Sequence, residues 1–380
     1  MAWNKKPSGQ IDKPTPPPYL KWLLFFLAAM IVSTCLLLTL EQKELKTNKL
    51  LSILIVISPV ILVLITLSTK LFIYIKNYRL YAFLEREKQY IDNQWCLWGE
   101  RSVSVLDSCL LLPEKTTLPY ILNHTQSHVS SYNITQKIDY LPNHHGACFY
   151  LLRSVKDIIL TLPPSLPLHI TYVTDKSNDD IAKKFRDSWV NLLKNKQYAN
   201  ISIISDFSFN NVDKIISKND EIINIIIFEQ NEIKNIQSEL MAIFILTSDD
   251  VTKKYQLSKK IDLKRPMSID ANDDIKNSIK IFGEVQVDSI NSVFLFSAGK
   301  INDQILAELY QSDNCFGYLS PQNMIDLEFF SGPTGKYAPW FIAALASQYV
   351  EQKRKPTVIL STENDVTFIS TITPVMKNEI

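Results

Sequence analysis

Two long apolar runs near the N-terminus set this part of the chain apart from the rest. The first covers residues 20–40 and has a single charge, Lys21, at its edge. The second covers residues 50–75, is uncharged until Lys70 and contains Pro59. About 20 apolar residues in a helix span the ~30 Å hydrocarbon core, and a membrane helix can absorb a proline as a kink. The pattern predicts two transmembrane helices, rather than buried soluble helices or a cleaved signal peptide.

Basic residues flank this pair in a way that favours both ends inside. The N-terminal side has Lys5, Lys6, Lys13 and Lys21, the link has Lys43, Lys46 and Lys49, and Lys76, Arg79, Arg86 and Lys88 follow. Positive charge marks the cytoplasmic side, and two spans bring both flanks to the same side. We therefore predict a cytoplasmic arm over 1–19, a transmembrane hairpin over 20–75, a juxtamembrane helix over 76–94 and a cytoplasmic domain over 95–380.

Composition narrows the compartment and the partners. The five cysteines stand at 35, 96, 109, 148 and 315, an odd number without a CxxC pair, so a disulfide framework is not expected. This agrees with a reducing compartment and an inner (cytoplasmic) membrane protein. The net charge of +1, from 40 basic and 39 acidic residues, offers no electrostatic reason to expect nucleic acid. The lipid bilayer and a protein are the expected partners.

Beyond residue 100 the hydrophobic period changes repeatedly between that of strands and that of helices. Strands are predicted at RSVSVLDSCLLLP (101–113), LHITYVTD (168–175), ANISIISD (199–206) and EIINIIIFEQ (221–230). Helices are predicted at CFYLLRSVKDIILTL (148–162), DDIAKKFRDSWVNLLKN (179–195) and NNVDKIISK (210–218), and a loop at 114–146. Apolar strands that alternate with helices indicate a largely parallel sheet with both faces covered.

A close pair of strands ends this series, and a similar order follows it. ELMAIFILTSDD (239–250) comes so soon after residues 221–230 that no helix fits between them, which predicts an antiparallel pair. Further on come a strand, SVFLFSAG (292–299), two helices, INDQILAELYQS (301–312) and YAPWFIAALASQYVEQ (337–352), and a second strand pair, PTVILSTENDVTFISTITP (356–374). We interpret the domain as an internal duplication, with halves at about 95–255 and 256–380.

The two segments SELMAIFILTSDD and KPTVILSTENDVTFISTITP stand where each half of a thiolase-like fold ends in a strand pair, and over residues 100–375 the chain resembles β-ketoacyl synthases. The resemblance implies a duplicated, layered α/β domain with mixed sheets. In that family a Cys at a helix N-terminus acts with His and Asn, or a second His. The matching places have Asn210 and Asn211, then Ser297, Ala298 and Gly299, then Ser331 and Gly332. The resemblance thus implies a degenerate domain that is not an enzyme.

Other chemistry has few candidates. Cys148 follows His144, His145 and Gly146 at a predicted helix start, where its pKa could fall, which makes it the one candidate nucleophile. We expect it instead to be a small buried residue on the helix face with Leu151, Leu152 and Val155. A metal site would use His124, His128 and His145, but their spacing matches no known zinc pattern. SGPTGK (331–336) has the wrong spacing for a phosphate loop, and it predicts a turn that opens the next helix, with Gly335 in the turn and Pro339 in the first helical turn. No cofactor is expected.

The blocks WCLWGERSVSVLDSCLLLP and SGPTGKYAPWFIAALASQYV, together with KPTVILSTEND, resemble the lipase-adaptor family of bacterial type VI secretion loci. The resemblance implies a protein that binds an effector and hands it to the secretion spike. Trp95 and Trp98 are candidate partner-binding residues, and packing or a membrane interface is their alternative role. The leading hypothesis is a membrane-anchored adaptor. The alternatives are an acyl- or thiol-transfer enzyme that uses Cys148 and a scaffold subunit of a membrane complex.

Overall fold

The protein is described by a computed structural model. It describes residue 3 and residues 12–42, 49–124, 127–142, 146–175, 178–194, 196–218, 220–233, 236–270, 273–311 and 319–375. The chain divides into two compact units. One is Lys5–Trp95, and the other combines Cys96–Ile380 with Met1–Asn4.

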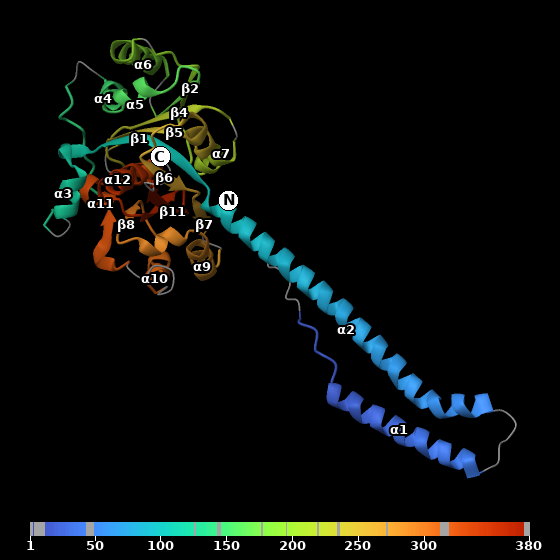
Figure 1. The fold of residues 1–380 in the computed structure, drawn as a ribbon. Coiled ribbons are helices and arrows are strands. Elements are labelled where there is room, and N and C mark those ends of the chain that lie inside the picture. Colours follow the sequence, from blue (N-terminus) through green and yellow to red (C-terminus); the bar gives the residue numbers. More distant parts are fainter. Residues whose placement is uncertain are drawn as a thin grey trace. The chain divides into compact units, whose positions relative to one another are not determined.

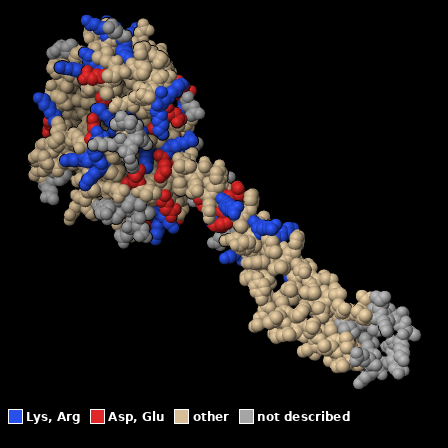
Figure 2. All heavy atoms as spheres, viewed as in Figure 1, with Lys and Arg blue, Asp and Glu red and all other residues tan. Residues whose placement is uncertain are grey.

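The first unit contains two apolar helices, α1 (Tyr19–Gln42) and most of α2 (Lys49–Glu100). Tyr19–Thr39 and Ile57–Glu100 are long enough to cross a membrane, and each contains an 18-residue stretch that is apolar enough to do so, with mean hydropathies of 2.3 and 1.9. Figure 2 shows the apolar parts of this unit as a tan region, whereas blue and red side chains of both signs lie along the later part of α2 and are interspersed over the domain. The helix α2 includes Pro59 and continues without a break to Glu100. The juxtamembrane helix predicted over 76–94 is therefore the later part of α2.

The second unit is built on one mixed sheet of eleven strands. The strand order is β3-β2-β4-β5-β1-β6-β11-β10-β8-β9, and β7 pairs with β11 (Figure 1). The strands are β1 (Ser102–Leu111), β2 (Leu168–Thr174), β3 (Asn200–Ile204), β4 (Ile223–Gln230), β5 (Leu240–Ser248), β6 (Ile261–Lys264), β7 (Met267–Ile269), β8 (Leu295–Ala298), β9 (Met324–Asp326), β10 (Thr357–Glu363) and β11 (Val366–Pro374).

The sheet contains the same four-strand arrangement twice. In the first half β2 pairs in parallel with β3 and β4, and β4 pairs antiparallel with β5. In the second half β8 pairs in parallel with β9 and β10, and β10 pairs antiparallel with β11. Both predicted strand pairs are thus confirmed, and the repeated pairing agrees with the predicted duplication. The antiparallel strands β1 and β6 lie between β5 and β11 and join the two halves.

Helices cover both faces of this sheet. They are α3 (Leu118–Asn123), α4 (Ala147–Ser154), α5 (Lys156–Thr161), α6 (Asn178–Leu192), α7 (Asn211–Ser217), α8 (Asp249–Tyr255), α9 (Ile275–Val285), α10 (Asp303–Gln311), α11 (Leu327–Ser331) and α12 (Ala338–Lys353). Short 3₁₀ helices are Pro113–Lys115, Val287–Asn291, Pro321–Asn323 and Gly335–Tyr337. Figure 1 shows α4, α5 and α6 together on one side of the sheet.

Two apolar cores lie on opposite faces of the sheet, as β5 illustrates. Its side chains are all buried, and Ala242, Phe244 and Leu246 belong to one core while Met241 and Ile243 belong to the other. This follows from the alternation of side chains along a strand. The first core surrounds α12, which is apolar on all sides and buried along most of its length. The second core lies under α4, α5 and α6.

Several elements differ from the sequence-based expectation. The helix predicted over 148–162 is divided at Val155, which has φ −108° and ψ 8° between α4 and α5. The loop predicted over 114–146 includes α3. The short strands β6, β7 and β9 were not predicted, because four or fewer residues leave too little periodicity to recognise. The helices α8, α9 and α11 were not predicted either. The turn before α12 is confirmed, with Gly335 at φ +62° and Pro339 in the first turn.

Trp3, from the N-terminal arm, packs within the domain. Its indole N–H donates to the carbonyl oxygen of Pro266 at 3.3 Å, and its ring lies 5.7 Å from Trp98 and 6.0 Å from Phe282. A Cβ at Gly99 would approach the Trp3 ring to 3.2 Å, so a glycine there leaves room for the indole. The side chain is 5% exposed. Trp3 therefore packs against Trp98 and Phe282 of the domain.

Candidate functional site

The start of α7 is the place where the family resemblance implies a nucleophilic cysteine. The main-chain N–H of Phe209 donates to Glu363 Oε2 at 2.9 Å, and the Ser208 hydroxyl donates to the same oxygen at 3.2 Å. Burial raises the pKa of the Glu363 carboxyl above its ordinary value. Asn210 stands at the N-cap position of α7, but its side chain makes no capping hydrogen bond to the helix. The Glu363 carboxylate is thus the hydrogen-bond acceptor for the segment that leads into α7.

The end of β8 lies beside this place. Ser297 and Ala298 are fully buried, and Gly299 has φ +80°. A Cβ at Gly299 would stand 3.2 Å from the carbonyl oxygen of Thr362, the residue before Glu363. The left-handed backbone and the close approach both favour glycine here. The β8 end thus closes against the β10 end.

The third place precedes α12 and is held by the first half of the domain. The Ser331 hydroxyl donates to the carbonyl oxygen of Leu327 at 3.0 Å and lies 3.0 Å from that of Gly332. The Thr334 N–H donates to Glu328 Oε1 at 2.9 Å. Ser331 is therefore occupied within its own turn rather than directed at a cavity.

Aromatic rings fill the space between the start of α7 and α12. Phe209 lies 5.1 Å from Trp340 and 5.8 Å from Phe368, and Trp340 stacks on Phe228 at 5.0 Å. All four side chains are 2% exposed or less. A packed aromatic cluster occupies the region that the resemblance associates with catalysis.

Cys148 lies at the start of α4, on the opposite face of the sheet. It is 3% exposed and packs in the second core, as the sequence-based alternative expected. Burial, and then the charge of Glu229, raise the pKa of its thiol well above the ordinary value. A pocket of about 240 Å³ is lined by Cys148 with Tyr172, Glu229 and Glu239. The Tyr172 hydroxyl donates to Glu229. This environment opposes the reactive thiolate that the neighbouring histidines suggested.

The histidines proposed as metal ligands are used in other contacts. His124 Nδ1 lies 3.0 Å from the carbonyl oxygen of Tyr120, and His128 Nδ1 lies 3.1 Å from the Tyr120 hydroxyl. His145 lies outside the described residues. Within the described part of the chain, no group of three or more His, Cys, Asp or Glu side chains is arranged to hold a metal ion.

The two tryptophans proposed for partner binding stand near the end of α2. The Arg265 guanidinium lies over the Trp98 ring, 4.0 Å from the ring centroid, and the same ring contacts Trp3. Trp98 is half-buried and belongs to the packing of the domain. Trp95 is also half-buried and is the last residue of the first unit.

The sequence did not reveal a group of four exposed apolar side chains on two loops of the domain that hydrogen bonds hold together. Tyr132, Ile134, Ile233 and Ile236 are 45%, 56%, 44% and 64% exposed, and we call them the loop patch. The loops are joined by hydrogen bonds from the Gln136 N–H to Ser238 Oγ at 3.1 Å and from the Glu239 N–H to the Gln136 carbonyl oxygen at 2.9 Å. An isoleucine in a predicted loop, such as Ile134, was the available sequence signal for an exposed apolar site. Its proximity to the second loop depends on the fold.

Asp326 lies beside the loop patch, and its carboxyl should make the stability of the fold depend on pH. It accepts from the Tyr132 hydroxyl at 2.6 Å and from the Glu328 N–H at 3.0 Å, and burial raises its pKa to about 6. The folded-state pKa of Asp326 exceeds the ordinary value of 3.8, so the fold favours the protonated carboxyl. This contribution to stability is complete below pH 3.8 and is lost as the pH rises through about 6.

We expect Asp326→Asn to flatten this dependence, because an amide keeps an acceptor for the Glu328 N–H without a titratable charge. Between pH ~4.5 and ~7, the wild-type free energy of unfolding should fall by about 2 kcal/mol relative to the variant. Urea unfolding at several pH values measures the difference. Parallel curves for the two proteins would contradict the assignment.

Comparisons with known proteins agree with the predicted fold. The chain is similar to AntDE:AntF, a type II PKS acyl-carrier protein in complex with its ketosynthase bound to the hexaketide. The TM-score is 0.50 and the sequence identity is 12%, and the match covers 72% of this chain and 100% of that chain. It is also similar to 3-oxoacyl-[acyl-carrier-protein] synthase III from Aquifex aeolicus, with TM-score 0.45, 11% identity and coverages of 72% and 100%. OleA from Xanthomonas campestris gives TM-score 0.44, 8% identity and coverages of 72% and 98%.

No protein-family model matches the sequence, and no curated protein matches it. The structural likeness shows that the domain has a thiolase-like fold, as the repeated strand pairing predicted. Such identities establish the fold and not the activity.

Proposed function

We propose that this chain is a non-catalytic adaptor, anchored in the inner membrane, whose thiolase-like domain binds a protein partner in the cytoplasm. The partner class is a secretion effector of the type handled by type VI adaptors. The loop patch carries the proposal. Its four exposed apolar side chains come from two loops that hydrogen bonds hold together, and such patches mark sites of protein interaction.

The chemistry at the edge of the loop patch defines the partner further. Lys137 and Glu232 form an ion pair at 3.2 Å there, so both signs of charge border the apolar side chains. An apolar centre with a polar border is typical of a protein interface. The partner would contribute an apolar segment with polar flanks.

The membrane topology has support from Trp3. This residue precedes α1, and it packs against Trp98 and Pro266 of the domain. An arm attached to the domain lies on the same side as the domain, which two membrane crossings require. A compartment-sensitive reporter fused after residue 380 should be active only in the cytoplasm, and activity in the periplasm would overturn this topology.

The non-catalytic part of the proposal rests on the packed aromatic cluster around Phe209 and Trp340. The acyl- or thiol-transfer alternative needs a reactive Cys148, and burial opposes ionisation of that thiol. Cys148→Ala separates the two hypotheses, because the adaptor retains partner binding without the thiol. A loss of function in that variant, with the fold retained, would favour the enzyme.

Site-specific photocrosslinking tests the proposed interface. A photoreactive residue at Ile236 should crosslink the full chain in its native membrane to one discrete protein. The matched control is Val190, which is 62% exposed on α6, outside the patch. Ile134→Glu should reduce the Ile236 crosslink about tenfold or more, since it places a charge in the apolar surface. Equal labelling from Val190 and Ile236 would contradict the interface, and a constant membrane-complex partner unrelated to secretion would favour the scaffold alternative.

A further inference from the structure

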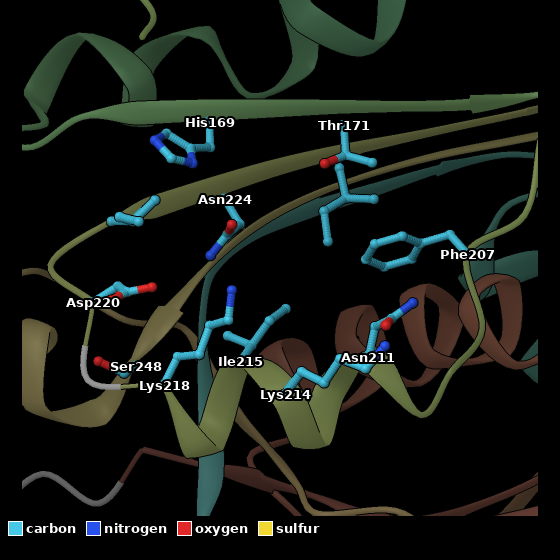
Figure 3. Close-up of a pocket in the computed structure, with 12 residues that line it drawn as sticks. His169, Thr171, Phe207, Asn211, Lys214, Ile215, Lys218, Asp220, Asn224 and Ser248 are labelled. Carbon is cyan, nitrogen blue, oxygen red and sulfur yellow. The ribbon is translucent and has the colours of Figure 1, made fainter. Parts of the chain in front are cut away.

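A second cavity, of about 280 Å³, lies between the sheet and α7 in the first half of the domain (Figure 3). His169 and Thr171 of β2 and Asn224 of β4 line the sheet side. Lys214 and Lys218 approach from α7 and the residue after it. The cavity is at the beginnings of β2 and β4, and its Phe207 wall adjoins the aromatic cluster through Trp340, 5.5 Å from Phe207 between ring centroids.

The second half of the domain shows which side chains stand at the matching positions of the sheet when a helix covers them. Thr171 pairs with Ile226 of β4, and Phe296 pairs with Ile359 of β10. Ile226 and Ile359 occupy the same position in their strands, four residues before the last residue of β4 and of β10. Thr171 is therefore equivalent to Phe296, and His169, two residues earlier, is equivalent to Phe294. Polar side chains in the first half replace two aromatic rings in the second.

Helix length explains why this face is open. In the second half, Phe294 and Phe296 pack against Tyr349 of α12, with ring centroids 5.4 Å and 5.2 Å apart. The helix α12 has 16 residues, whereas its counterpart α7 has 7. The shorter helix leaves the His169 and Thr171 side of the sheet uncovered, and the cavity occupies this space.

Three polar side chains on the sheet side of the cavity have no hydrogen-bond partner among the described residues. The side chains of His169, Thr171 and Asn224 are half-buried and make no hydrogen bond to a described residue. By contrast, Thr357, which is equivalent to Asn224, donates to the carbonyl oxygen of Phe294 at 2.8 Å. These three side chains can therefore hydrogen-bond to solvent or to a ligand in the cavity without giving up a contact within the protein.

Charge and shape indicate the ligand class. Lys214 and Lys218 form no ion pair with a described residue, and Asp220 is the one acidic side chain in the lining. Figure 3 shows the Lys218 amine directed into the cavity on the same side as Asn224. Phe207 and Ile215 form an apolar wall. Two lysines with neutral donors suit an anionic head, and the apolar wall suits a short hydrocarbon tail.

We propose that this cavity binds a small organic anion, with a phosphate or carboxylate head between Lys218, His169 and Asn224 and a short apolar tail against Phe207. The site is separate from the loop patch, and it does not depend on the proposed adaptor function. The two head groups share the same recognition chemistry, and the experiment distinguishes them.

The test is isothermal titration of the purified full chain in detergent with butyl phosphate, hexanoate and inorganic phosphate as separate probes. One of the two organic anions should bind with 1:1 stoichiometry and at least about threefold more tightly than inorganic phosphate, because only they reach the Phe207 wall. Its affinity should fall with added salt. The tighter of butyl phosphate and hexanoate identifies the head group.

Three variants make the result specific. The double variant Lys214→Met with Lys218→Met should weaken binding about tenfold or more, and the exposed control Lys276→Met should leave it unchanged. His169→Phe with Thr171→Phe refills the space with the rings of the second half and should abolish binding while the protein stays folded by circular dichroism. The proposal is overturned if neither organic anion binds at ~10 mM, or if the refilled variant binds as the wild type does.

Discussion

Gly332→Ala is expected to lower the free energy of unfolding by about 4 kcal/mol, because the backbone and the space at this position both exclude a side chain. Gly332 has φ +72° and ψ −172°, a conformation almost restricted to glycine. An added Cβ would stand 2.1 Å from the carbonyl oxygen of Ile134 and 2.6 Å from Ser238 Oγ. Neither neighbour can move without disturbing the hydrogen bonds between the two loops. Urea unfolding of the full chain in detergent, followed by tryptophan fluorescence, measures the loss.

Gly146→Ala is the matched control. Gly146 has φ −63°, and nothing lies within 4 Å of its ideal Cβ, so only its place as the N-cap of α4 disfavours alanine, and we expect a loss of at most about 1 kcal/mol. Because Ile134 belongs to the loop patch, Gly332→Ala should also weaken the crosslink from Ile236 under conditions where the protein is still folded. Equal stability of the two alanine variants would refute this account of the loops.

Gln286→Leu is expected to cost about 4 kcal/mol of unfolding free energy. Gln286 is fully buried, and its amide nitrogen donates to the carbonyl oxygens of Arg265 at 2.7 Å and Gly99 at 3.3 Å. Its amide oxygen accepts from the Thr371 N–H at 3.0 Å. Leucine leaves three buried main-chain groups without partners, each worth about 1–3 kcal/mol. The same urea titration measures this change.

The position of Gln286 gives the substitution a second consequence. Gly99 is in the last turn of α2, Arg265 follows β6 and Thr371 is in β11, so one side chain ties the end of the apolar helix to the central strands. Gln304→Leu, on the exposed side of α10, is the control and should be nearly neutral. If Gln286→Leu were equally neutral, the three hydrogen bonds would not contribute as described.

The repeated strand pairs were predictable because their signals are local. The segments that became β4 and β5 are mostly apolar and separated by too few residues for a helix, so an antiparallel pair was the simple solution. The same reasoning applied to β10 and β11. Their recurrence after similar helices led to the thiolase-like fold, which the structural comparison supports.

The candidate sites were less predictable, because they depend on distant contacts. His124 and His128 looked like ligands by residue type, but Tyr120 engages both. Cys148 looked reactive because of its neighbours in sequence, whereas the apolar side chains packed around it raise its pKa. The loop patch brings Ile134 and Ile236 together through hydrogen bonds between loops with no common sequence signal.

By itself, the sequence determined the two apolar helices, the alternation of strands and helices and the duplication, because hydrophobic period and short connections act over neighbouring residues. Only the tertiary structure decided how β1 and β6 join the halves, how Trp3 packs against Trp98, and where α7 leaves the cavity beside His169. These features arise from contacts between residues far apart in the chain, and their energies depend on burial and geometry that no local pattern encodes.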